Sequence, residues 1–296
     1  MQNSLIERYE RWGFPQRNNL KIKKCLRINS NQKSDSEIVK RLERKKVKLT
    51  KVNFLEHGFF FKSHFPLSTI IENLLGYIYI QEAPAQIPVE VISKDIKFRN
   101  LDKNKLKILD MCASPGGKTT QLSEILENKG LVVAIDNKHS RVKKLKFNLE
   151  RMKVENCDVY TKDAQDIEGI IENYGHFDYV LLDAPCSGNF TSEKNWFNKR
   201  KINDFINRQK LQKKLLESAV KSLKKNGILV YSTCSLEKEE NEDVIEYGIN
   251  DLNLRLEPTQ INIGSEGITK ETKNCLRIWP TQHKMGGFFV AKLKKK

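Results

Sequence analysis

The sequence lacks any long apolar run, and this excludes a membrane-spanning helix. A membrane span needs about 20 apolar residues, but the most apolar candidate, residues 70–80, is interrupted by Glu72, Asn73 and Gly76. Residues 1–12 contain four charged side chains and no apolar core of the kind found in signal peptides. The sequence therefore predicts a cytoplasmic protein with no membrane partner.

Cysteines at metal-binding spacing are also missing. The six cysteines form no Cys-x-x-Cys element and lie at positions Cys25, Cys112, Cys157, Cys186, Cys234 and Cys275. No metal site is expected from this spacing, and cysteines in a chain without a signal peptide are normally reduced. We expect Cys25, Cys157 and Cys275 to be structural thiols in the core.

Acidic residues are in the minority, with 37 Asp and Glu against 53 Lys and Arg in 296 residues. The formal net charge of +16 favours a polyanionic partner, because each neutralised phosphate releases condensed counterions. A lysine-rich solvated surface is the alternative interpretation. The hydrophobic content of 39% and charged content of 30% are those of a globular protein, and the length suggests two units.

The first hundred residues mix helical and extended patterns. Ser34 and Glu37 have the spacing of a capping box and predict the start of a helix. Residues 49–55 alternate like a strand, and a helical run is expected from Pro66 to Gly76. We therefore predict a small, basic α+β domain over residues 1–104.

From residue 105 onward, short apolar runs alternate regularly with helical patterns. Predicted strands cover residues 107–111, 131–135, 158–161, 179–182 and 227–231. Predicted helices cover residues 119–127, 140–152, 167–173, 201–224 and 237–249. This alternation predicts an α/β unit over residues 105–296, with a Rossmann-like, mostly parallel sheet and helices on both faces.

A glycine-rich loop follows the first of these strands. Its residues are Cys112, Ala113, Ser114, Pro115, Gly116, Gly117 and Lys118. Glycines let the backbone approach a ligand closely, and the following helix offers free N–H groups. A nucleotide P-loop, the alternative, needs glycine where Cys112 stands, and Pro115 removes an N–H from the phosphate site.

Acidic residues follow the next strands. Asp136 ends the second strand and can accept hydrogen bonds from a ribose diol, whereas Asp163 and Asp183 follow the third and fourth strands. A single aspartate after a strand is usually a turn former. Three of them beside a glycine-rich loop indicate a nucleoside site, which Asp163 would complete by accepting from an adenine amino group.

Two cysteines also follow strands on this side of the predicted sheet. Cys186 lies in Asp183-Ala184-Pro185-Cys186, and Cys234 lies in Thr233-Cys234. A cysteine in such a loop is a candidate nucleophile when its surroundings lower the pKa of the thiol. We expect both thiols at one site.

Together these elements resemble the Nop/Sun-domain family of RNA 5-methylcytosine methyltransferases. Two further segments match that family: Arg277-Ile278-Trp279-Pro280, followed by residues 287–291, and Leu26-Arg27-Ile28-Asn29. The match runs in order over most of the chain, and the length is similar to that of minimal archaeal-type members. The resemblance implies a class I methyltransferase fold for residues 105–296, S-adenosylmethionine as cofactor and RNA as partner, with tRNA as first choice and rRNA as second. It makes residues 1–104 the expected RNA-binding region, with the basic segments 21–24 and 41–51 as the expected contacts.

The resemblance also implies residue roles. Cys234 would attack carbon 6 of cytosine, and Cys186 would aid release of the product. Asp183 would contact the polar edge of the base and border the cofactor, and Lys118 would contact both ligands. Arg141 resembles a cofactor-site position, with a surface salt bridge as an equal alternative. DNA cytosine methyltransferases instead attack with the Pro-Cys thiol, so the assignment of roles depends on the family.

Other interpretations stay open at this point. A non-catalytic RNA-binding or ribosome-assembly factor could keep the fold and the charge, but it would not need both cysteines. Methylation of an exocyclic amine needs no thiol and normally uses an aromatic residue where Cys186 stands. Phe190 could stack on a base or anchor a loop, and Ala83-Pro84-Ala85 departs from the family pattern. We expect a monomer.

Overall fold

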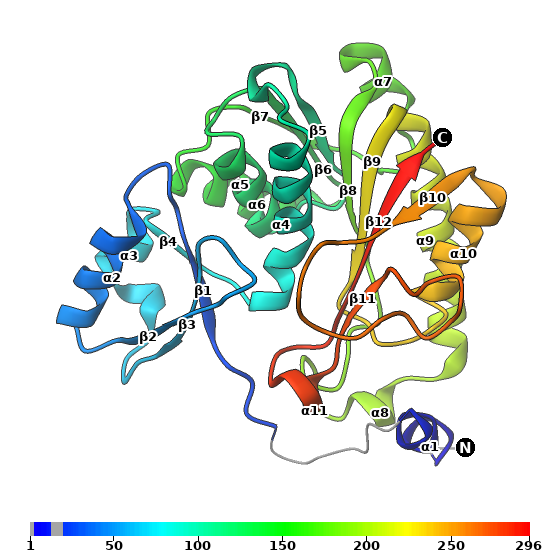
Figure 1. Cartoon of the computed structure of the whole chain (residues 1–296), viewed down its shortest axis with the longest axis horizontal. Helices are drawn as coiled ribbons and strands as arrows, with labels where there is room; N and C mark the ends of the chain where they lie inside the picture. Colours follow the sequence, from blue (N-terminus) through cyan, green and yellow to red (C-terminus); the bar gives the residue numbers. More distant parts are fainter. Residues whose placement is uncertain (1–2, 13–19) are drawn as a thin grey trace.

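Two sheets lie side by side in the structure (Figure 1), a computed structural model that describes residues 3–12 and 20–296. One sheet has four strands and the other has eight. Residues 1–2 and 13–19 of the predicted 1–104 domain lie outside the described residues. Within the described ranges, no helix is long and apolar enough to cross a bilayer.

The large sheet confirms the predicted α/β class. Its strands, in spatial order, are β10 (Leu254–Glu257), β12 (Phe288–Lys295), β9 (Leu223–Thr233), β8 (Phe177–Asp183), β5 (Lys107–Asp110), β6 (Leu131–Asp136) and β7 (Cys157–Thr161), and β11 (Leu276–Ile278) pairs with β12. Neighbouring strands from β9 to β7 are parallel, whereas β10, β11 and β12 pair antiparallel.

Helices cover both faces of this sheet because its central strands are apolar on both sides. One face packs against α4 (Ala83–Phe98), α5 (Gly117–Ile125) and α6 (His139–Arg151). The other packs against α7 (Glu168–Tyr174), α9 (Ile202–Ser222) and α10 (Glu242–Asp251).

The strand order places a crevice at the centre of the sheet. The chain runs outward from β5 through β6 to β7 and then returns to β8 on the other side of β5. At such a reversal, the loops that follow neighbouring strands diverge and leave room for a ligand. The carboxyl ends of β5, β6, β8 and β9 therefore surround one site.

The small sheet has the order β2 (Lys48–Lys51), β3 (Gly58–Lys62), β1 (Cys25–Ile28), β4 (Ile78–Ile80), and every pair is antiparallel. Helix α2 (Asp35–Arg44) buries Ile38 and Leu42 against it. The side chain of Ser34 accepts from the Glu37 amide at 3.3 Å, which confirms the predicted N-cap.

The run after Pro66 is less regular than predicted. It forms the 3-10 turn η1 (Leu67–Thr69) and the short helix α3 (Ile71–Leu74), separated by the extended residue Ile70.

The structure divides residues 1–104 differently from the prediction. Helix α4 packs against β8, β9 and β12 of the large sheet, and its buried side chains Ile87, Val91 and Ile92 belong to that sheet's core. Helix α1 (Asn3–Arg11) lies beside α8 (Trp196–Lys199) at the lower right of Figure 1, and its Leu5 and Tyr9 share a core cluster with Trp196 and Phe197. Only the segment from β1 to β4 packs as a separate small unit.

The domain boundary differs from the predicted one at residue 104 because the spacing of apolar residues does not show which element buries α4. Its apolar side chains pack against β8, β9 and β12, and the first of these strands begins at Phe177, 79 residues after α4 ends at Phe98. Pro84 lies in the first turn, where a missing N–H costs nothing, and Pro88 still allows the helix to continue. The η2 turn (Lys103–Lys105) then leads directly into β5.

Candidate active site

The main cavity lies at the carboxyl ends of the central strands and has a volume of about 460 Å³. Its lining includes these residues predicted from the sequence: Cys112, Ser114, Asp136, Arg141, Asp163, Asp183, Cys186 and Cys234. A side cavity of about 260 Å³ adjoins it and shares Cys112, Ser114 and Asp183. The side cavity is also lined by Ala113, Pro115, Gly117 and Lys118.

Gly116 lines neither cavity but determines the path of the loop. Gly116 lies directly before α5, and its backbone is in the left-handed region, with φ of 101°. A Cβ atom there would lie 2.9 Å from the side chain of Leu145 on α6, so the position requires glycine for both conformation and space. The Ala113 amide donates to the carbonyl of Ile135 at 2.9 Å and holds the loop against β6.

Asp136 is held at the end of β6 by its neighbours. Its carboxylate accepts from the amides of Ser114 and Lys138, both at 3.2 Å, and pairs with Arg141 at 3.3 Å. Arg141 also donates to the Ser114 carbonyl at 2.8 Å. Arg141 therefore makes a salt bridge and lines the main cavity, so both of the roles considered for it are compatible with its position.

Asp163 lies in the loop after β7 and is exposed. It accepts from the Gln165 amide at 2.9 Å, as a turn-forming aspartate does, and it lines the main cavity.

Cys186 and Cys234 are in direct contact, with their sulfur atoms 3.0 Å apart. The hydrogen bond that the Cys186 thiol donates lowers the pKa of Cys234 and raises the pKa of Cys186. The ammonium group of Lys118 favours the Cys234 thiolate, whereas burial and Asp183 oppose it. The contact therefore leaves Cys234 with the lower pKa of the two thiols and Cys186 with the higher.

Asp183 and Lys118 form an ion pair beside these sulfur atoms. The Lys118 ammonium lies 2.6 Å from one carboxylate oxygen of Asp183, and the Ser232 hydroxyl donates to the other oxygen at 2.7 Å. The pair presents an acceptor and a cationic donor at the junction of the two cavities.

The buried carboxylate of Glu240 connects the two cysteine loops. It accepts from the amide and hydroxyl of Ser187, next to Cys186, and from the Ser235 hydroxyl, next to Cys234, at 2.9 Å. Gln212 donates to Glu240 and also to the Pro185 carbonyl. Glu240 is not among the residues predicted from the sequence, because residues 237–243 look like the start of a solvated helix.

Aromatic contacts support the anchor role considered for Phe190. Its ring stacks on Phe197, with centroids 5.5 Å apart, and meets Tyr9 edge to face. Phe190 therefore anchors its loop through these aromatic contacts. Asn189 beside it donates to the Cys234 carbonyl at 2.7 Å and fixes the second cysteine loop.

The remaining cysteines that were expected to be structural lie away from this cavity. Cys25 and Cys275 are buried, and burial raises the pKa of Cys25 to about 12. Burial also raises the pKa of Cys157, which packs beside the core.

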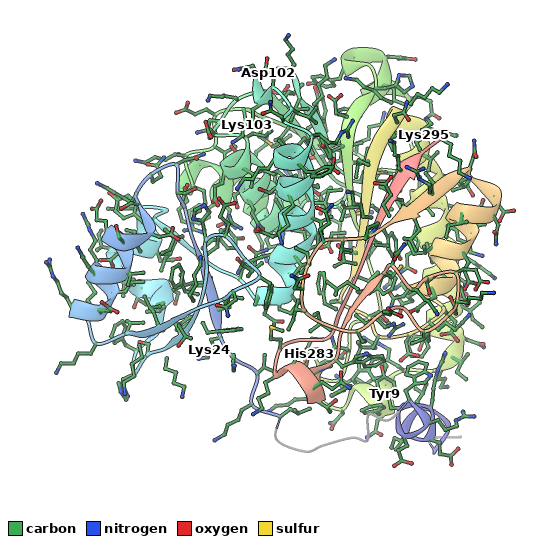
Figure 2. The ribbon with its side chains drawn as sticks, viewed as in Figure 1. Tyr9, Lys24, Asp102, Lys103, His283 and Lys295 are labelled. Carbon is green, nitrogen blue, oxygen red and sulfur yellow. The ribbon has the colours of Figure 1, made fainter. Side chains whose placement is uncertain are left out.

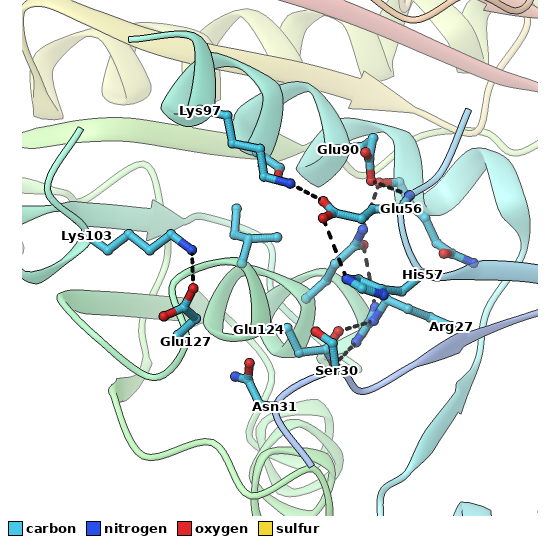
Figure 3. A pocket seen from close by; sticks show the side chains of 14 residues that line it. Arg27, Ser30, Asn31, Glu56, His57, Glu90, Lys97, Lys103, Glu124 and Glu127 are labelled. Atoms are coloured by element: carbon cyan, nitrogen blue, oxygen red, sulfur yellow. Dashed lines mark hydrogen bonds and ion pairs between the residues drawn. The ribbon is translucent and has the colours of Figure 1, made fainter. Parts of the chain in front are cut away.

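Arg27 joins the small sheet to the helix that follows the glycine-rich loop. Its guanidinium binds the Glu124 carboxylate at 2.7 and 2.9 Å, the Gly117 carbonyl at 2.8 Å and the Thr120 hydroxyl at 2.8 Å. Figure 3 shows Arg27 and Glu124 at one wall of a polar cavity of about 150 Å³ between the small sheet's loops, α4 and α5. The sequence offered Arg27 only as part of a family motif.

The main and side cavities fit the donors and acceptors of S-adenosylmethionine. The Asp136 oxygens retain lone pairs for a ribose diol, and Ala164, Leu211 and Leu215 supply an apolar surface for an adenine ring. Within the described part of the chain, one buried carboxylate oxygen of Asp110 has no hydrogen-bond partner. Asp110 lines the side cavity, so this oxygen is an acceptor beside the glycine-rich loop.

Sequence comparisons connect the chain to RNA-modifying proteins. A model of the family described as 16S rRNA methyltransferase RsmB/F matches residues 99–294. The human 28S rRNA (cytosine(4447)-C(5))-methyltransferase is 36% identical, over 79% of this chain and 29% of the human protein. Ribosomal RNA small subunit methyltransferase F of Shewanella piezotolerans is 35% identical, over 93% of this chain and 58% of that protein. The chain thus spans less than two thirds of either relative.

Solved structures agree with this fold. A methyltransferase homolog protein from Pyrococcus horikoshii is 34% identical and superposes with a TM-score of 0.81, over 93% of this chain and 87% of that one. NSun6 from Pyrococcus horikoshii with SFG superposes with a TM-score of 0.80, over 93% and 92% of the two chains. At 24% identity, NSun6 supports the fold alone.

Replacing Arg27 with alanine should destabilise the protein by about 3–5 kcal/mol, because the Glu124 charge is then buried without its partner. Urea unfolding measures this loss. The double variant Arg27→Met, Glu124→Leu removes both charges and should lose much less. A change of under about 1 kcal/mol for Arg27→Ala would contradict the role of the ion pair.

Replacing Cys186 with alanine should raise the pKa of Cys234, because the thiolate loses a hydrogen-bond donor. The pH profile of Cys234 alkylation by iodoacetamide, read by mass spectrometry, measures the shift. Cys186→Ser keeps a donor, so its profile should stay closer to the wild-type profile. An unchanged or lower midpoint in Cys186→Ala would exclude this hydrogen bond as the cause.

Proposed function

The chain belongs to the RsmB/F family of 16S rRNA methyltransferases, and from this we propose that it methylates carbon 5 of a cytosine in RNA. The methyl donor is S-adenosylmethionine. The observation that carries the proposal is the contact between Cys186 and Cys234, 3.0 Å apart in a cavity that also contains Asp136 and Asp183.

A thiol is needed because carbon 5 of cytosine is a weak nucleophile. Addition of the Cys234 thiolate to carbon 6 forms a carbon–sulfur bond and moves the ring's π electrons toward carbon 5. S-adenosylmethionine, when bound, supplies an electrophilic methyl group for that carbon. The proton on carbon 5 must then pass to a base, a role for which Cys186 lies in contact with the attacking sulfur. The electrons of that carbon–hydrogen bond re-form the double bond between carbons 5 and 6 as the carbon–sulfur bond breaks and expels the Cys234 thiolate.

The residues around Cys234 support this cycle. Cys186 donates to the Cys234 sulfur before attack and is placed to aid release afterwards. Asp183 accepts from the amino group of the cytosine, and Lys118 donates to the ring's polar edge. Their ion pair at 2.6 Å keeps both groups oriented.

The main and side cavities divide the cofactor between them. Asp136 binds the ribose diol, Asp163 faces the adenine amino group, and Arg141 keeps Asp136 in place. The loop from Cys112 to Gly117 supplies backbone groups and admits the ligand closely because of its glycines.

We propose ribosomal RNA as the substrate, because both named relatives are rRNA methyltransferases. The sequence alone favoured tRNA, and tRNA remains the alternative that the trapping experiment tests. A non-catalytic RNA-binding factor is the second candidate, but it has no need of two thiols in contact. Cytoplasmic localisation and a monomeric state remain predictions.

Cys186→Ala should accumulate RNA bound covalently to Cys234, because the step that releases the product is slowed. After incubation with S-adenosylmethionine and either total rRNA or total tRNA, a denaturing gel should show a shifted band with rRNA. The double variant Cys186→Ala, Cys234→Ala should give no band. A band with tRNA alone would make tRNA the substrate. A band from the double variant would exclude Cys234 as the attacking thiol, and a band from Cys234→Ala alone would reverse the assigned roles.

Asp136→Ala should weaken binding of S-adenosylhomocysteine by roughly 10- to 100-fold, because hydrogen bonds to a charged group are lost. Titration calorimetry measures the affinity. Asp251→Ala, an exposed aspartate at the end of α10, serves as the matched control and should bind like wild type. Equal affinities of the two variants for S-adenosylhomocysteine would show that Asp136 does not bind the cofactor.

A further inference from the structure

A groove of about 530 Å³ on the small unit leads toward the side cavity, and neither the cofactor nor the thiol chemistry requires it. We call it the lysine groove. Its lining includes Ile22, Lys23, Lys24, Phe61, Phe65 and Ile80. These residues come from the segment before β1, from β3 and its following loop, and from β4.

The lysine groove continues into the proposed active site. It shares Ile80 and Gln81 with the side cavity, which in turn shares Cys112 and Asp183 with the main cavity. A polymer whose target residue reaches Cys234 can therefore extend along one connected surface to the small unit. A free nucleoside would not need this extension.

The charge of the lysine groove suits a phosphate backbone. Lys23 and Lys24 are exposed, and among the described lining residues Glu82 is the single carboxylate. The Lys23 amide donates to the Lys284 carbonyl at 3.1 Å, which fixes this segment against the C-terminal part of the chain. Figure 2 shows Lys24 and His283 on the same edge of the molecule.

The groove also offers apolar surface that base faces can cover. Phe65 is 37% exposed and Ile80 is 39% exposed, so both present apolar atoms to solvent beside the lysines. In a duplex the base faces are stacked on one another, whereas a single strand can place them on aromatic and aliphatic side chains. This combination of lysines and apolar side chains therefore favours a single strand over a duplex.

We infer that the lysine groove binds the single-stranded RNA that flanks the target cytosine, an inference that rests on the proposed function. Phe65 and Ile80 contact the face of a neighbouring base, and Lys23 and Lys24 contact its phosphates. Glu82 can accept from a base amino group and thereby favour some neighbours over others. An extruded target base leaves its neighbours unstacked, as this arrangement requires.

The test measures fluorescence anisotropy of a labelled, unstructured oligoribonucleotide containing one cytosine, and of a hairpin that pairs the same cytosine. Phe65→Ala should weaken binding of the unstructured RNA about tenfold through lost stacking. Lys23→Ala with Lys24→Ala should reduce the slope of log affinity against log salt by about 1.4, because two phosphate contacts are lost.

Matched controls lie on the opposite edge of the molecule, near Asp102 and Lys103 in Figure 2. Phe98 is a phenylalanine that is 78% exposed, and the Lys105 side chain is 86% exposed. Phe98→Ala and Lys105→Ala should bind the unstructured RNA like wild type. Thermal melting of all variants checks that each protein is folded.

The outcomes separate this inference from the proposed function. If the groove variants bind the unstructured RNA like wild type, or weaken only hairpin binding, the inference is overturned. If the groove variants weaken RNA binding while the wild type methylates neither rRNA nor tRNA, RNA binding by the groove is supported and the proposed function is wrong. If the wild type methylates RNA and the groove variants do so with an unchanged KM for RNA, the proposed function is supported and RNA binding by the groove is excluded.

Discussion

The contact between two thiols is the constraint on which the rest of the site depends. A separation of 3.0 Å between Cys186 and Cys234 lets one thiol hold a proton while the other becomes a nucleophile. The two cysteines lie in loops after different strands, so neither loop can move independently. The buried carboxylate of Glu240 bonds to the neighbours of both cysteines and holds the loops together. The catalytic geometry is therefore supported by a polar network that lies beneath the surface of the cavity.

A second network connects the two units of the chain. Arg27 of the small sheet occupies carbonyl and hydroxyl groups in the first turn of α5, directly after the glycine-rich loop. Lys118 in the same turn reaches Asp183 beside the cysteines. The small unit is thus fixed against the element that borders both cavities. The buried ion pair between Arg27 and Glu124, at 2.7 Å, holds the two units together at this junction.

Much of the candidate site could be placed from the sequence because parallel strands bring their carboxyl ends to one edge. Asp136, Asp183, Cys186 and Cys234 follow strands that apolar runs identify, so their convergence required only the alternation of strands and helices. The predicted domain boundary at residue 104 differed from the observed packing because it depends on contacts between distant segments, which local patterns do not show. The side of α4 that is buried depends on a sheet formed largely by later residues, including Ile228 and Val290.

The sequence by itself determined the fold class, the order of the loops and the chemical types of residue at the site, because these follow from local periodicity and short motifs. The tertiary structure alone decided which charges are buried and which groups touch. Glu240 looks like part of a solvated acidic run, and Arg27 looks like an ordinary strand residue. Both became structural centres because they contact partners far along the chain: Ser187 lies 53 residues from Glu240, and Glu124 lies 97 residues from Arg27. Local patterns carry no information about such distant contacts.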